Sequence, residues 1–182
     1  MAAFLCLLPL GCSKEQGVSN PFLNTYTTPL ETPPFHLIKN EHFMPAFLKG
    51  MEEQKAEIDS ILNKPEAPTF QNSVEAFERT GILLDRVASV FYALQGANTN
   101  DEIQKIANDV APLLAKHKDD INLNEKLFGC VKAVYDQRNK LGLNTEQTRL
   151  LEEMYKNFVR GGANLPADKK DRFRKINEEL SL

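Results

Sequence analysis

Apolar residues recur at helical spacing through most of the chain beyond residue 40. In the segment 41–62 they are three, four or seven positions apart, which places them on one face of a helix. No stretch alternates apolar and polar residues for long enough to indicate a sheet. The pattern therefore predicts an all-α fold: an array of about six amphipathic antiparallel helices after an extended N-terminal segment. The inward residues of the first helix are Phe43, Phe47, Met51, Ile58 and Leu62.

The second predicted helix covers 72–95 and contains a glycine. Asn72 is a suitable N-cap, and Glu75 stands at the reciprocal capping-box position. Gly81 lies inside the segment and costs about 1 kcal/mol relative to Ala in a helix, which is explained if a neighbouring helix packs closely there. The inward residues are Val74, Phe77, Leu84, Val87, Phe91 and Leu94.

Four more helices follow, each with its own start or stop residue. One begins after Thr99 and continues past Pro112, which should kink it. Another covers 123–141 and stops at Gly142. The next is capped by Asn144, with Gln147 opposite, and stops at 161–162. The last opens at Pro166. The inward residues predicted for the first three of these helices are Ile103, Ile106, Val110, Leu114, His117, Ile121, Leu127, Val131, Val134, Leu141, Leu151, Met154 and Phe158. The last helix carries the apolar residues Phe173, Ile176 and Leu180.

The last helix carries no C-terminal stop residue. The sequence ends at Leu182, still in helical register. Helices usually close with Gly, Asn or a polar tail. We therefore expect the coding sequence to be cut here, and Ile176, Leu180 and Leu182 to expose apolar surface.

The first residues have the pattern of a targeting segment. An apolar run of nine residues, 2–10, is followed by Gly11 and Cys12. This fits a signal peptide over 1–11 in which Cys12 becomes a lipidated N-terminus. Such a lipoprotein would lie in the cell envelope, on the periplasmic side. Two alternatives remain open: secretion without a lipid, and an apolar terminus that is not a signal, which would leave the protein cytoplasmic. Residues 12–39 read as an extended tether whose Phe22 and Phe35 pack on the helices.

Charge and composition limit the partners. The 22 basic and 25 acidic residues are interspersed and give a net charge of −3, so no nucleic-acid surface is predicted. No apolar run approaches the ~18–20 residues of a membrane-spanning helix, so any membrane attachment would be through the lipid alone. Cys130 lies among apolar residues of a helix and is predicted to be an inert, buried side chain.

The residues required for zinc-peptidase chemistry are not found in this sequence. Such sites use two His one helical turn apart with a Glu beside them. The three histidines, His36, His42 and His117, have Asn, Ala and Ile four residues on. We expect His42 to cap or pack at a helix start and His117 to be a buried, hydrogen-bonded core residue. We expect the adjacent acidic pairs, Asp119-Asp120 among them, to lie on helix faces exposed to solvent. No catalytic, cofactor-binding or metal-ligating residue is therefore predicted.

Five sequence blocks, in this order and spacing, resemble one family. They are PFHLI with HFMPAF at 34–47, PTFQNSVEAFE at 68–78, PLLAKHKDDI with NEKLF at 112–128, RLLE with FVRGGANL at 149–165, and INEELS at 176–181. Over residues 20–182 the chain is similar to the N-terminal region of the bacterial peptidyl-dipeptidases and oligopeptidases of the thimet oligopeptidase family, which are zinc metallopeptidases.

The resemblance implies a nearly all-helical enzyme with a deep channel. One zinc is held there by H-E-x-x-H and a distant Glu, and the enzyme cleaves short peptides. The catalytic residues belong to the C-terminal half, so none can be carried onto this sequence. Residues 40–182 would be an N-terminal helical domain that forms one wall of the channel and is inactive alone. The alternative is a non-catalytic helical module that binds peptides or a partner. The resemblance does not separate the peptidyl-dipeptidase branch from the endopeptidase branch.

Overall fold

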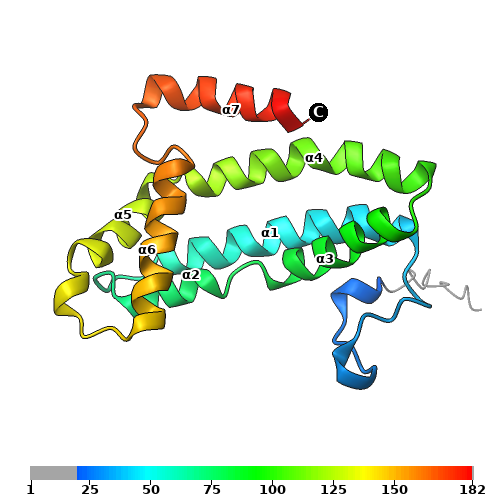
Figure 1. The fold of residues 1–182 in the computed structure, drawn as a ribbon, viewed down its shortest axis with the longest axis horizontal. Coiled ribbons are helices and arrows are strands. Elements are labelled where there is room, and N and C mark those ends of the chain that lie inside the picture. The colour runs from blue at the N-terminus through cyan, green and yellow to red at the C-terminus, as the bar shows by residue number, and fades with distance from the viewer. Residues whose placement is uncertain (1–19, 182) are drawn as a thin grey trace, which may run out of the picture.

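The computed structural model describes residues 20–181, which form an all-α fold without strands (Figure 1). This confirms the predicted fold class. A π-helical turn, Phe70–Glu75, leads into the three-residue α2, and 3₁₀ turns occupy Pro21–Leu23, Pro29–Glu31, Asn40–His42 and Arg138–Lys140. The helices are α1 (Phe43–Leu62), α2 (Ala76–Glu78), α3 (Ile82–Ala97), α4 (Asp101–Asn122), α5 (Glu125–Asp136), α6 (Thr145–Arg160) and α7 (Ala167–Ser181).

The helices α1 and α3 lie side by side around a core of aromatic rings (Figure 1). The Phe91 ring meets Phe43 at 5.0 Å and Phe47 at 5.3 Å in edge-on arrangements, a geometry that the ring quadrupole favours. All three side chains are fully buried. Gly50 lets the two backbones approach, because a Cβ there would lie 2.8 Å from Leu84 Cα.

The segment before α1 is partly built into this core. Phe22 is fully buried, with its ring 5.2 Å from that of Phe43. Its carbonyl accepts a hydrogen bond of 2.5 Å from Arg86 of α3, and Asn20 donates to the His42 carbonyl at 2.8 Å. The expected packing of Phe22 is confirmed. That of Phe35 is wrong, because its side chain is 53% exposed.

A second core joins α5, α6 and the turn at Phe70–Glu75. The predicted inward residues of α6 are buried, and the Asn144–Gln147 capping box forms as expected: each side chain accepts a hydrogen bond from the other residue's backbone N–H. The buried residues of this core are Ile58, Phe70, Val74, Leu127, Phe128, Val131, Val134, Leu151, Met154, Phe158 and Ala163.

The helix predicted over 72–95 is instead two segments. The chain leaves the helix after Glu78, and Gly81 takes the left-handed conformation, with φ of +79°, before α3 begins. The Gly81 N–H donates to the Glu57 carboxylate at 2.8 Å. The N-terminal cap is Thr69, paired with Asn72. Gly81 is therefore a break, because a left-handed residue does not continue a right-handed helix.

Two further boundaries differ from the sequence-based expectation. The helix predicted over 123–141 ends at Asp136 and gives way to a 3₁₀ turn, so Leu141 is 40% exposed and does not point inward. Gly142 has a φ of +62° but is not the stop of this helix, whose C-cap is Gln137. The helix α4 is capped by Asn100, one residue later than expected, and continues through Pro112.

The helix α7 lies above α4 in Figure 1 and runs alongside it. Some of its apolar side chains are exposed to solvent. Ile176 is 42% and Leu180 is 80% exposed, as predicted. Leu182 lies outside the described residues. Within residues 20–181, no helix combines the length and apolar character needed to cross a membrane.

Candidate ligand-binding cavity

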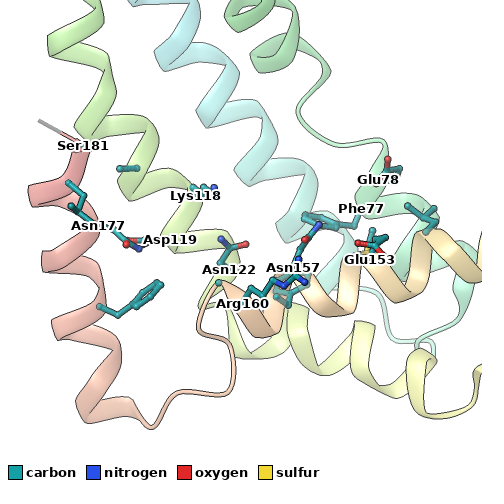
Figure 2. Close-up of a pocket in the computed structure, with 17 residues that line it drawn as sticks. Phe77, Glu78, Lys118, Asp119, Asn122, Glu153, Asn157, Arg160, Asn177 and Ser181 are labelled. Atoms are coloured by element: carbon teal, nitrogen blue, oxygen red, sulfur yellow. Dashed lines mark hydrogen bonds between the residues drawn. The ribbon is translucent and has the colours of Figure 1, made fainter.

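A cavity of about 950 Å³ lies between α2, α4, α6 and α7 (Figure 2). Aromatic and aliphatic side chains form part of its wall, and charged and amide side chains the rest. Its apolar lining includes Phe77, Leu150, Met154, Phe158, Phe173 and Leu180. Its polar lining includes Glu78, Lys118, Asp119, Asn122, Glu153, Asn157, Arg160, Asn177 and Ser181.

The corner between α6 and α7 sets the position of the cavity. A Cβ on Gly161 would lie 2.8 Å from the Asn122 side chain, so only glycine lets the end of α6 approach the end of α4 this closely. Gly162 follows with a φ of +90°, a conformation that L side chains rarely adopt. The chain can therefore turn sharply after α6 and send α7 back along α4.

Polar pairs hold α7 to α4 and α5. The Asn177 amide donates to an Asp119 carboxylate oxygen at 2.7 Å. Arg174 pairs with Asp120 at 2.6 Å. Near the start of α7, the largely buried Lys170 ammonium donates to Glu125 at 2.7 Å. Helix α7 is thus fixed mainly by charged and amide groups.

The expectation that Asp119 and Asp120 form a solvated face is wrong. Asp119 is only 4% exposed and lines the cavity, because α7 covers this face of α4. Partial burial raises the pKa of Asp120, but the hydrogen bond from Arg174 and the charge of Lys116 outweigh it and hold that pKa below its ordinary value. Asp119 has a different partner: it accepts a hydrogen bond from the neutral Asn177 amide, and no cation among residues 20–181 forms an ion pair with it.

Asp119 is the site residue that the sequence reasoning missed. The helical pattern of α4 was read along the line Leu114, His117 and Ile121. Asp119 lies four residues before the buried Leu123, on a neighbouring line of the same helix. Asp119 and Leu123 define a second line of inward residues beside the first, and two such lines indicate that α4 is covered on two sides.

The histidines occupy separate, structural positions. His36 is exposed. His42 is buried, and its Nδ1 accepts a hydrogen bond from the Lys39 N–H at 3.0 Å, which confirms a role at the helix start. His117 is half-buried, and its Nε2 lies 2.7 Å from Gln54 Oε1. The prediction of a hydrogen bond is confirmed, while its burial is only partial. Burial lowers the pKa of His117 below its ordinary value.

The described residues do not fit a zinc site. Across residues 20–181, no three or more His, Cys, Asp and Glu side chains gather in a way that could hold a metal ion. Cys130 is half-buried, and burial raises the pKa of its thiol, which disfavours the reactive thiolate. Cys12, the predicted lipidation site, lies outside the described residues.

Comparison with curated proteins places the chain among peptidase sequences. Dipeptidyl carboxypeptidase of Salmonella typhimurium is 42% identical over 161 residues, covering 88% of this chain and 24% of that protein. The Escherichia coli protein of the same name is 42% identical over 162 residues, covering 89% and 24%. Oligopeptidase A of Escherichia coli is 25% identical over 164 residues, covering 90% and 24%. No family model matches the chain.

These homologues are consistent with an N-terminal region of the thimet-like peptidase family, as the sequence blocks indicated. The chain spans 24% of the length of each of these three relatives.

Proposed function

We propose that this chain is the N-terminal helical part of a zinc-dependent metallopeptidase that hydrolyses short peptides. The supporting observation is the 42% identity to proteins named dipeptidyl carboxypeptidase along 88% of the chain. The more distant oligopeptidase A matches nearly the same span. Matches over 88% and 90% of the chain include most of the helical array, and the part proposed here for that array is one wall of the substrate channel.

The zinc site of the proposed enzyme would lie in a part other than these 182 residues. A catalytic zinc takes three protein ligands in fixed geometry and keeps one position for water. The sequence contains no H-E-x-x-H, and His42 and His117 are engaged with Lys39 and Gln54. We therefore propose that this chain does not hydrolyse peptides by itself.

The test compares two proteins: the 182-residue chain, and a chain extended through the rest of its reading frame. Each is incubated with zinc and an internally quenched fluorescent oligopeptide. We expect turnover by the extended protein, abolished by a chelator, and none by the short chain. A short chain whose turnover survives removal of contaminating peptidases would overturn the assignment. So would a downstream reading frame that lacks H-E-x-x-H.

We further propose that Cys12 is acylated and anchors the protein in the bacterial cell envelope. The support is the sequence: an apolar run at 2–10 that ends in Gly11-Cys12. Labelled palmitate should enter the wild type and the Cys6→Ala variant, and should not enter Cys12→Ala. Absence of label from the wild type, or label in Cys12→Ala, would contradict the proposal. Since one acyl chain binds membranes only marginally, stable anchoring would need the several chains of a lipoprotein.

A further inference from the structure

We propose that the cavity between α4, α6 and α7 is a binding site for an ammonium group of a peptide, with Asp119 as its counter-ion. The proposal rests on the proposed function for the choice of a peptide as ligand. The location of the ammonium group rests on Asp119 alone.

The first argument is the unbalanced charge of Asp119. A carboxylate removed from water is ordinarily paired with a cation or bound by a metal, because burying an isolated charge is costly. Asp119 is the one acidic residue among the buried polar residues of the described chain. The buried cation, Lys170, is paired with Glu125, and the neighbouring Asp120 is paired with Arg174. Asp119 has only the neutral Asn177 amide.

The second argument is that Asp119 lies on the wall of the cavity. Figure 2 shows Asp119 of α4 and Asn177 of α7 together at the edge of the space that α6 bounds on its other side. The Asn177 amide fixes one carboxylate oxygen at 2.7 Å and adds no charge. A ligand ammonium in the cavity would complete the missing ion pair. Cavities of about 300–1,000 Å³ hold small ligands, and the volume here is about 950 Å³.

The lining also contains two cations, Lys118 and Arg160, and two further carboxylates, Glu78 and Glu153. Its uncharged side chains suit the peptide that carries this ammonium. The side chains of Asn122 and Asn157 line the cavity and make no hydrogen bond to another described residue, so their amides are available to backbone carbonyls. Phe158 and Phe173 offer apolar surface for side chains. A short peptide would therefore find an anion for its ammonium, donors for its carbonyls and apolar contacts.

The ammonium could come from two sources: a peptide N-terminus or a lysine side chain. Three tetrapeptide amides separate them: tetra-alanine with a free amino terminus, the same peptide N-acetylated, and an N-acetylated peptide with one lysine among its alanines. Binding to the 182-residue chain is measured by calorimetry. We expect the two peptides that carry an ammonium, or one of them, to bind at least about tenfold more tightly than the neutral peptide.

Asp119→Asn removes the charge and keeps the shape, since its amide oxygen can still accept from Asn177. The matched control is Glu178→Gln, which makes the same change in net charge at an exposed position of α7. We expect Asp119→Asn to abolish the preference for ammonium peptides and the control to retain it. Equal binding of charged and neutral peptides, no binding of any peptide, or an unchanged preference in Asp119→Asn would each refute the proposal.

A measurement on the wild type tests the proposal even if the Asp119→Asn variant does not fold. In ¹³C-labelled protein, the carboxyl carbon resonance of Asp119 should shift on addition of the ammonium peptide, while that of Glu178 should not. An Asp119 resonance that does not shift when the ammonium peptide is added would overturn the proposal. Self-association that Asp119→Asn abolishes would assign the cavity to a second copy instead. None of these results depends on hydrolysis, so they are distinct from failure of the peptidase assignment.

Discussion

Gly50→Ala should destabilise this protein, although helix propensity predicts the opposite. Gly50 lies inside α1, where Ala is favoured over Gly by about 1 kcal/mol. Its position against α3 reverses the expectation. A Cβ at Gly50 would lie 2.8 Å from Leu84 Cα and 2.9 Å from Leu84 N. Both atoms are backbone, so no side chain can rotate away and α3 itself must move.

The magnitude follows from these two opposing effects. Overpacking a close contact costs about 1–3 kcal/mol when backbone must shift. Subtracting the ~1 kcal/mol gained in helix propensity leaves a net loss of about 0–2 kcal/mol. We expect a value in the upper part of this range, because both close contacts are with backbone atoms. For a domain of this size, each kcal/mol lowers the unfolding midpoint by about 2–4 °C.

Gly129→Ala is the matched control. Gly129 lies inside α5, and a Cβ there would meet no atom within 4 Å, so only the propensity gain applies and this variant should be stabilised by about 0.5–1 kcal/mol. Both variants are measured by urea unfolding followed by circular dichroism. A Gly50→Ala variant that is as stable as the wild type, or more so, would refute the close contact between α1 and α3.

Three further predictions concern single groups. Phe22→Ala should cost about 3–5 kcal/mol because its ring is fully buried, whereas Phe35→Ala should cost little; equal urea midpoints for the two variants would contradict this. Asn144→Ala should cost about 1 kcal/mol through loss of the α6 cap, which the same assay would test. The folded-state pKa of Asp120 is lowered, so its stabilisation should be complete above the unfolded-state pKa of about 4 and lost as pH falls through the lower folded value. Thermal unfolding between pH 5 and 2 should therefore show a weaker pH dependence in Arg174→Ala, and an unchanged dependence would argue against the pair.

Apolar periodicity predicted the helical array because it reports which face of each helix is covered. The inward residues of α6 and the cap at Asn144 follow directly from spacing and local chemistry. That periodicity does not predict the backbone conformation of an individual residue. The left-handed Gly81 interrupts the helix predicted over 72–95 while the apolar spacing continues on either side. The Gly81 N–H forms a tertiary hydrogen bond to Glu57 of α1, a contact that the sequence close to Gly81 does not contain.

The cavity was not predictable for a related reason. Adjacent acidic residues on a helix usually face water, and the contrary signal beside Asp119 and Asp120 is a single apolar residue, Leu123, four positions after Asp119. Their burial depends on α7, which begins more than 40 residues later and reaches them only because the glycines at 161–162 turn the chain back. Long-range polar pairs of this kind leave no periodic pattern in either partner.

The way α7 is attached also accounts for the cavity itself. Had α7 been held by its apolar residues, Ile176 and Leu180 would turn toward α6 and tend to close the space between the helices. Ile176 is instead 42% and Leu180 80% exposed, while Arg174 and Asn177 face α4 and bond to its two aspartates. Hydrogen bonds are directional and fix a register, whereas apolar contact is not directional and favours collapse. The polar attachment therefore keeps α7 on α4, leaves about 950 Å³ open beside α6, and places the Asp119 carboxylate on the wall of that space.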